Sequence, residues 1–114
     1  MPYIDITTNA AISRTEEENI KNAVARAMEE SFPGKTENWL MVRVTGGSCM
    51  YFGGSGDKCA MFDVSIFGRQ NASAYDRMTS LLCGISEKHL GVNPSRTYVK
   101  YSEVENWGWN GSDF

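Results

Sequence analysis

The sequence has few of the features that mark membrane, secreted and nucleic-acid-binding proteins. It contains no apolar run long enough to span a bilayer and no basic segment followed by an apolar one at its start, so neither a membrane span nor a signal peptide is expected. Its 11 Lys and Arg residues are scattered and are outnumbered by 14 Asp and Glu residues, giving a formal net charge of -3. Because binding to a phosphate backbone needs clustered positive charge, nucleic acid is not an expected partner.

Cysteine and histidine are also scarce. The three cysteines, Cys49, Cys59 and Cys83, are an odd number without paired spacing, which is typical of free thiols in a reducing compartment such as the cytoplasm. The single histidine, His89, and the absence of a Cys-x-x-Cys pair argue against a zinc site. The glycine-rich residues 52–56 are not followed by the Gly-Lys-Ser/Thr of a nucleotide-binding loop. We therefore predict no metal and no cofactor.

The first half of the chain reads as strand, helix, strand. Residues 3–8 alternate, with Ile4 and Ile6 on one face, which predicts a strand. Ser13, followed three residues later by Glu16, is a capping box that opens an amphipathic helix ending near Ser31. Residues 39–44 alternate again and predict a second strand, with three apolar side chains on one face, those of Leu40, Val42 and Val44.

The second half repeats this order without obvious sequence identity to the first. Residues 59–67 give the clearest alternation in the chain and predict a third strand. Ser73 and Asp76 are the candidate caps of a second amphipathic helix, which Gly91 ends. Residues 97–101 predict a fourth strand.

The 114 residues, 41% of them hydrophobic, suit a single domain covering residues 1–114. The order predicts an α/β fold, namely a two-layer sandwich of two β-α-β units, in which two helices cover a four-stranded sheet. Helices that join strands predict right-handed crossovers and parallel pairs within each half. The other face of the sheet would carry Trp39, Met61, Phe67 and Tyr98, so we expect it to pack against copies of the chain in a closed homo-oligomer.

The first two residues, Met1 and Pro2, suggest a chemical role. Aminopeptidases remove an initiator Met that precedes a small residue, and this would leave Pro2 with a free secondary amine. An α-amino group titrates at roughly 7.7–8.0, and burial or a nearby cation lowers its pKa. Such an amine can act as a general base at neutral pH. The alternative is structural: the proline ring merely begins a strand.

Short motifs recur along nearly the whole chain. They are Met1-Pro2, Thr8-Asn9, Gly34-Lys35, Phe52-Gly53-Gly54-Ser55, Cys59-Ala60, Leu82-Cys83-Gly84, Arg96-Thr97-Tyr98 and the tail from Gly108 to Phe114. Each is weak alone, and their order and spacing together are specific. In this order and spacing the chain resembles the macrophage migration inhibitory factor (MIF) family of the tautomerase superfamily.

This resemblance implies a homotrimer whose sheets form a central barrel, with an active site between neighbouring subunits. It implies keto–enol tautomerase activity on phenylpyruvate-like and dopachrome-like compounds, so the expected ligand is a small aromatic α-keto acid or its enol. Carried onto matching positions, Pro2 would be the base, Lys35 would hold the substrate carboxylate and Tyr98 would come from the neighbouring subunit. The mouth that binds the aromatic ring would be shaped by Trp107, Trp109 and Phe114.

Three positions depart from the family pattern. Phe67 stands before Gly68 where the family usually has isoleucine, which puts pocket depth and substrate fit in question. Lys100 stands where the family often has asparagine, and with Lys35 it could keep the prolyl nitrogen neutral and attract an anionic acid. Residues 59–62 lack the Cys-x-x-Cys of the vertebrate members, so thiol oxidoreductase activity is not carried over.

Structural alternatives remain open for each of these residues. Lys35 and Lys100 could be ordinary solvated lysines, Tyr98 could be a core tyrosine, and the tail aromatics could seal a subunit interface. A second functional hypothesis also remains: a cytokine-like protein that is secreted without a signal peptide, binds a receptor and keeps only a vestigial pocket.

Overall fold

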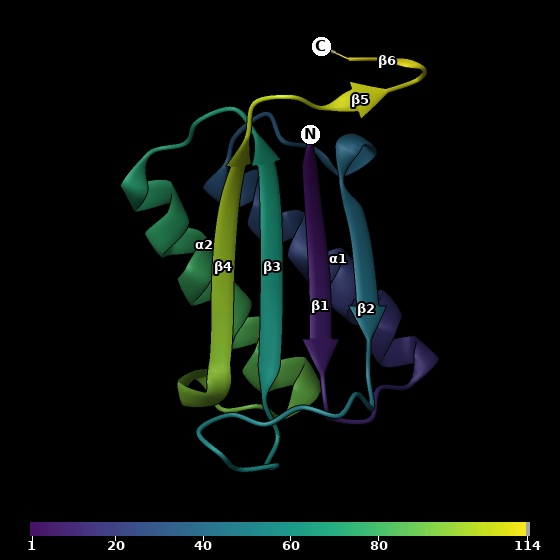
Figure 1. Cartoon of the computed structure of the whole chain (residues 1–114), viewed down its shortest axis with the longest axis vertical. Coiled ribbons are helices and arrows are strands. Elements are labelled where there is room, and N and C mark those ends of the chain that lie inside the picture. The colour runs from purple at the N-terminus through teal and green to yellow at the C-terminus, as the bar shows by residue number, and fades with distance from the viewer. Residues whose placement is uncertain (114) are drawn as a thin grey trace.

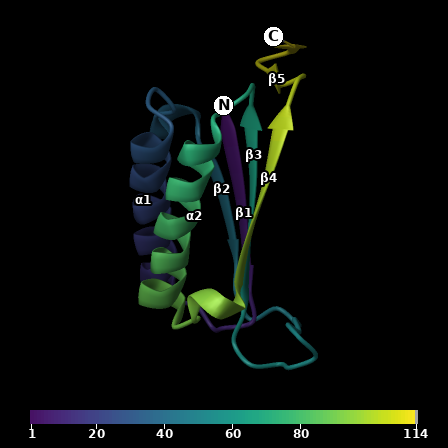
Figure 2. The same cartoon turned by 90° about the vertical axis from the view of Figure 1, so that its left-hand side faces the viewer.

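A computed structural model describes residues 1–113 of the chain in two layers, a β-sheet and two helices that cover one of its faces (Figure 1 and Figure 2). The sheet order is β2-β1-β3-β4. The long elements are β1 (Pro2–Thr8), α1 (Arg14–Ser31), β2 (Met41–Thr45), β3 (Ala60–Phe67), α2 (Ala72–Ile85) and β4 (Thr97–Val104). Three short helical turns are η1 (Glu37–Trp39), η2 (Ser86–Leu90) and η3 (Pro94–Arg96).

The strand pairing confirms the two β-α-β units. β1 is parallel to β2, and β3 is parallel to β4, because a helix carries the chain back to the starting edge in each half. The halves join through the antiparallel pair β1–β3. This join places the beginning of β1 beside the end of β3, with Pro2 opposite Ile66.

The core lies between the sheet and the helices. Alternate residues of β1 and β3 are buried against α1 and α2, and their largest fully buried members include Ile4, Ile6, Phe62 and Ile66. Ser13 caps α1 as the sequence predicts, because its side chain accepts a hydrogen bond from the Glu16 N–H at 3.1 Å. No helix within residues 1–113 has both the length and the apolarity to cross a membrane.

Several predicted boundaries are wrong. Trp39 belongs to a 3-10 turn, and β2 begins only at Met41. The cap of α2 is Asn71, whose side chain accepts from the Ala74 N–H, rather than Ser73 or Asp76. Asn71 lies two residues before the predicted cap, where its extended backbone leaves the side chain free to turn back onto the first helical turn. β4 continues past residue 101 to Val104.

The tail forms a hairpin that the sequence analysis did not include. β5 (Gly108–Trp109) pairs antiparallel with β6 (Ser112–Asp113). The turn between them, Asn110-Gly111, has positive φ at both residues, 51° and 86°. This is the backbone of a two-residue hairpin turn, for which Asn-Gly is the preferred sequence. The hairpin lies beyond the end of the sheet where β1 begins (Figure 1).

Candidate functional site

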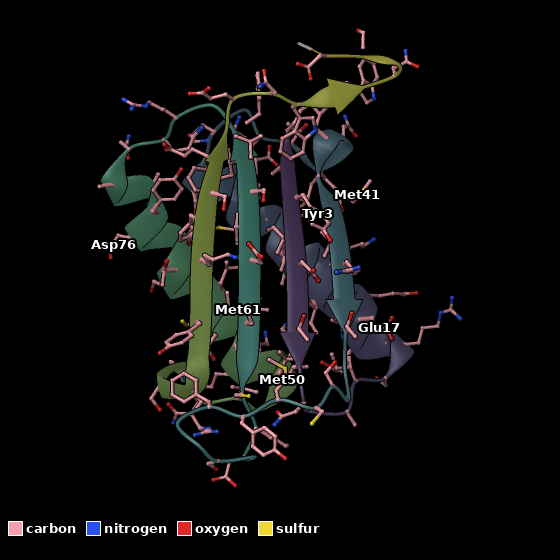
Figure 3. All side chains as sticks on the ribbon, in the orientation of Figure 1. Tyr3, Glu17, Met41, Met50, Met61 and Asp76 are labelled. Atoms are coloured by element: carbon pink, nitrogen blue, oxygen red, sulfur yellow. The ribbon has the colours of Figure 1, made fainter. Side chains whose placement is uncertain are left out.

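A cleft of about 910 Å³ opens at the N-terminal end of β1, under the tail hairpin. β1 and β2 form its floor, β3 contributes one residue, and the segment after β4 forms its roof. The residues that line it are Met1, Pro2, Tyr3, Trp39, Met41, Val42, Arg43, Val44, Ser65, Val104, Trp107, Gly108 and Trp109. Figure 3 shows Tyr3 and Met41 side by side on β1 and β2. The cleft therefore contains Pro2, Trp107 and Trp109 of the predicted site.

Pro2 is buried in this cleft, and in the chain that carries Met1 its nitrogen is part of a peptide bond. The Met1 carbonyl oxygen accepts a hydrogen bond from the Phe67 N–H at 3.1 Å. Burial, together with the positive charge of Lys35, lowers the pKa of the Met1 amino group below its usual 8.0. An amine at this end of β1 is therefore easier to deprotonate than one in open solvent.

Lys35 reaches this amine from the turn that follows α1. Gly34 has φ 92°, a conformation that glycine adopts without strain, and the Lys35 N–H donates to the Phe32 carbonyl at 3.0 Å. The Lys35 Nζ then lies 3.5 Å from the Phe67 carbonyl oxygen, to which it donates. Lys35, Phe67 and Met1 thus lie next to one another, and of these three Met1 lines the cleft.

Two tryptophans form an aromatic wall of the cleft. The Trp39 and Trp109 rings meet edge to face, with centroids 5.1 Å apart and an interplanar angle of 79°. Both rings are about half exposed, so the wall faces open space. Trp107 lines the same cleft.

The sequence analysis predicted only Pro2, Trp107 and Trp109 among the residues that line the cleft, and those it missed include Trp39, Met41 and Arg43. Strand alternation places Met41 and Arg43 on the face of Tyr3, because Tyr3 is opposite Met41 in the parallel pair. That register was available only after β1 and β2 had been paired. Arg43 makes two hydrogen bonds to the Asp5 carboxylate, at 3.1 and 2.5 Å.

Two predicted site residues lie away from the cleft of their own chain. Tyr98 is near the start of β4, at the opposite end of the sheet, where its ring packs against Phe52 with centroids 4.8 Å apart. The Lys100 Nζ lies 3.2 Å from an Asp63 carboxylate oxygen on the open face of the sheet. A single chain therefore does not bring either residue to Pro2. Phe114, the last predicted residue, lies outside the residues that the structure describes.

The remaining nucleophilic and titratable candidates do not gather into a second centre. Cys49 is exposed, Cys59 is buried, and burial raises the pKa of the Cys83 thiol. His89 lies in the last turn before Gly91, with Nδ1 3.3 Å from a Glu16 carboxylate oxygen. Within residues 1–113, no three His, Cys, Asp or Glu side chains are grouped closely enough to hold a metal ion.

Comparison with known proteins gives a consistent result over the full length. The family model described as macrophage migration inhibitory factor (MIF) matches residues 1–114. The macrophage migration inhibitory factor of Meriones unguiculatus is 29% identical, over 100% of this chain and 99% of that protein. The macrophage migration inhibitory factor homolog of Brugia malayi is 30% identical, over 100% of this chain and 99% of that protein.

Solved structures agree with this match. The crystal structure of Leishmania major MIF2 superposes with a TM-score of 0.93 at 25% identity, covering 100% of this chain and 97% of that one. The homologue from Prochlorococcus marinus superposes with a TM-score of 0.88 at 26% identity, covering 98% of each chain. The predicted resemblance and the predicted α/β fold are confirmed.

Proposed function

The chain belongs to the macrophage migration inhibitory factor family, and from this premise we propose that it is a keto–enol tautomerase. Its general base would be the nitrogen of Pro2, exposed when Met1 is removed. Its substrate would be a small aromatic α-keto acid or the corresponding enol. The observation that carries the proposal is the Met1 amine, whose pKa is lowered by burial and by Lys35, because removal of Met1 would expose the Pro2 nitrogen next to the same surroundings.

A base for this reaction must be uncharged before it can take a proton. The acidic proton lies on a carbon next to a carbonyl, and its removal creates an enolate. Burial and a neighbouring cation both disfavour the protonated amine, so the Pro2 nitrogen would be largely neutral near neutral pH. A base positioned in this way typically contributes about 10²–10⁴-fold to the rate.

The position of Met1 supports a binding role for the groups around it. The Met1 carbonyl oxygen accepts from the Phe67 N–H, and the Met1 amine lies beside Lys35. After Met1 is removed, a substrate oxygen in the place of the Met1 carbonyl would accept the same hydrogen bond. The Lys35 cation would then stabilise the substrate carboxylate or the developing oxyanion.

The rest of the cleft suits an aromatic ring. Trp107, Trp109 and Trp39 provide apolar surface with one open side, and aromatic rings pack well edge to face or offset. A volume of about 910 Å³ lies within the usual range for small-molecule sites. Phe67 is half-buried and lines a neighbouring cavity of about 310 Å³, which shares Val104 with the cleft. A bulkier side chain than isoleucine there would change how deeply the ring enters.

We propose that the working enzyme is a homotrimer in which Tyr98 and Lys100 complete the cleft of a neighbouring subunit. Both residues lie on the open face of β4, and Tyr98 is 62% exposed in the single chain. Tyr98 could donate a hydrogen bond to the substrate oxygen. Lys100, which pairs with Asp63 in one chain, would add a second positive charge near the substrate.

The direct test is steady-state turnover of phenylpyruvate enol by protein whose N-terminal mass shows that Met1 is absent. Pro2→Gly keeps a free N-terminal amine but removes the rigid secondary amine, and it should reduce kcat by about 10²–10⁴-fold. The circular dichroism spectrum and the oligomer mass should stay unchanged. Unchanged turnover in that variant would reject Pro2 as the base, and retained Met1 in fully active protein would do the same.

A second function follows from the names of the relatives, which are migration inhibitory factors. We propose as the alternative that the protein acts outside the cell as a cytokine-like ligand after export without a signal peptide. The two functions separate cleanly: receptor engagement should survive Pro2→Gly if the pocket is vestigial. Binding that disappears together with turnover would count against the alternative.

A further inference from the structure

Both turns that carry the proposed site contain a glycine with positive φ. Gly34, with φ 92°, directly precedes Lys35, and Gly68, with φ 86°, directly follows Phe67. Because glycine has no side chain to restrict its backbone, neither turn fixes its own shape. Contacts from outside the two turns must therefore set the separation between the Lys35 cation and the Phe67 backbone.

Tyr75, near the start of α2, lies against the turn that carries Lys35. Its ring meets the Phe32 ring edge to face, with centroids 5.6 Å apart and an interplanar angle of 64°. Phe32 is 1% exposed, and its carbonyl oxygen accepts the hydrogen bond of the Lys35 N–H at 3.0 Å. Tyr75 therefore packs on the residue that anchors the Lys35 backbone.

The hydroxyl of the same side chain reaches the turn that carries Phe67. It donates a hydrogen bond to Glu103 Oε2 at 2.8 Å, and this oxygen also accepts from the Gln70 N–H at 3.0 Å. Gln70 lies in the connection between Phe67 and α2, and Glu103 is near the end of β4. We call Tyr75 and Glu103 the brace, because together they contact both turns.

The protonation states of the brace suit a permanent contact. Burial, together with the Glu103 carboxylate, raises the pKa of Tyr75 to about 12, so its hydroxyl keeps its proton at neutral pH. Hydrogen bonds from the Gln70 N–H and the Tyr75 hydroxyl lower the pKa of Glu103 below its usual value, so the carboxylate remains an acceptor. The donor and the acceptor of the brace therefore keep their roles near neutral pH.

We propose that Tyr75 and Glu103 are positioning residues of the tautomerase, an inference that rests on the proposed function. Within residues 1–113 neither side chain lines the cleft, so both act through the two turns. They hold the Lys35 cation beside the Phe67 N–H, which would bind a substrate oxygen. The hydrogen bond from Lys35 Nζ to the Phe67 carbonyl is 3.5 Å long, so a small shift of either turn would break it. A misplacement of about 1 Å can lower a rate about 10²-fold.

The test compares Glu103→Ala with Glu103→Gln. Both variants remove the negative charge, but only Glu103→Gln keeps a side-chain oxygen that can accept from the Gln70 N–H and the Tyr75 hydroxyl. With phenylpyruvate enol, kcat should fall about 10-fold in Glu103→Ala and less than about 3-fold in Glu103→Gln. The proposal is overturned if Glu103→Ala leaves kcat unchanged, or if the two variants lose kcat equally.

A matched pair of tyrosine variants covers the case in which Glu103→Ala does not fold. Tyr75→Phe keeps the ring on Phe32 and removes only the hydroxyl that contacts Glu103, so kcat should fall about 5-fold. Tyr101→Phe is the control, because the partners of its hydroxyl are the Thr79 hydroxyl at 2.9 Å and the Tyr75 carbonyl at 3.3 Å. It should lower the melting temperature and leave kcat unchanged. Equal losses of kcat in the two variants would reduce the brace to a structural role and overturn the proposal.

A measurement that needs no substrate separates this proposal from the tautomerase proposal. In protein without Met1, the pKa of the N-terminal amine, followed by NMR titration, should be higher in Glu103→Ala than in Glu103→Gln. The charge at position 103 is the same in both variants, so the difference reports whether Lys35 stays beside the amine. Equal pKa values would overturn the brace. A wild-type protein without turnover that still shows this difference would reject the tautomerase and keep the brace.

Discussion

At one end of the sheet, Asn9 and Arg96 hydrogen-bond the backbone of the connection between β2 and β3. At the other end, Lys35 lies beside the N-terminal amine, and Trp39, Trp107 and Trp109 line a cleft. We call these the loop end and the cleft end. The Asn9 side-chain nitrogen donates to three carbonyls, those of Met50, Gly56 and Asp57, and its oxygen accepts from the Cys59 N–H at 2.9 Å. The Arg96 guanidinium donates to the carbonyls of Ser55, Asp57 and Lys58 and lies over the Phe52 ring.

The polar side chains at the loop end have a structural role, whereas Lys35 at the cleft end is available to a ligand. Asn9 uses its donors and its acceptor on the chain itself, so its contribution is to order the loop. Lys35 makes one long hydrogen bond to a carbonyl and otherwise sits beside the N-terminal amine. A substitution should therefore change stability at the loop end and catalysis at the cleft end.

The largest effect should come from Lys35→Gln. The variant removes the cation that would stabilise the substrate carboxylate and oxyanion, so kcat/KM should fall about 100-fold. Its free energy of unfolding should change by less than about 0.5 kcal/mol, because the side chain forms only one long hydrogen bond. The matched control is Lys58→Gln, an exposed lysine at the loop end, which should leave kcat/KM unchanged. Equal losses in both variants would erase the distinction between the ends.

The next largest effect should come from Asn9→Ala at the loop end, where we expect a loss of stability with little change in turnover. Asn9→Ala removes the acceptor of the Cys59 N–H and the donor to the Met50 and Gly56 carbonyls, while the Asp57 carbonyl keeps its hydrogen bond from Arg96. Urea unfolding should therefore show a loss of about 2 kcal/mol. Turnover of assembled protein below its melting range should remain within about 2-fold of the wild-type rate. A large loss of turnover with unchanged stability would show that the loop end takes part in the chemistry.

A smaller effect should follow from Gly111→Ala in the tail hairpin. Gly111 has φ 86°, where a side chain costs about 1–2 kcal/mol, so the hairpin should hold Trp109 less firmly. We expect KM for an aromatic acid to rise about 5-fold with little change in kcat, measured by steady-state kinetics. Asn110→Gly is the control, since glycine accepts its φ of 51° without strain, and KM should not rise.

The smallest effect should be a displacement of the pH profile. Burial and Lys35 lower the pKa of the Met1 amine. We expect the same surroundings to lower the pKa of the Pro2 amine after Met1 is removed, so kcat/KM should rise with pH and level off below the ordinary α-amino value of 8.0. Removing the cation in Lys35→Gln should raise this pKa and move the rising limb to higher pH. A limb that stays in place would show that Lys35 does not act on the base.

Much of the fold could be predicted from the sequence, because the apolar residues that alternate along each predicted strand are the ones that face the core. Ile4 and Ile6 in β1, and Phe62 and Val64 in β3, are fully buried as their alternation predicts. The sequence was less informative where several neighbouring residues could fill the same structural role. Asn71, rather than Ser73, caps α2, although all the candidate side chains can accept from a helix N-terminus.

The candidate site was readable only in part. Pro2, Trp107 and Trp109 line the cleft, and Lys35 lies beside the Met1 amine, whereas the roles that the sequence analysis gives these residues stay predictions. Met41 and Arg43 enter the cleft through the β1–β2 register, which depends on tertiary pairing. The alignment of Arg43, Asp5, Asp63 and Lys100 across the four strands likewise depends on the registers of three strand pairs, so no single segment reveals it.

Met1 and Pro2 line the floor of the cleft, and Gly108 and Trp109 of the tail hairpin line its roof. The start of β1 and the hairpin lie at the same end of the sheet (Figure 1). Fusion of a purification tag or a fluorescent protein to either end would therefore crowd the mouth of the cleft, and an N-terminal tag would also keep Pro2 acylated. The turn at Gly53 and Gly54, at the far end of the sheet and open to solvent, is the better place for a label. Apparent inactivity of a tagged preparation would then reflect the tag rather than the protein.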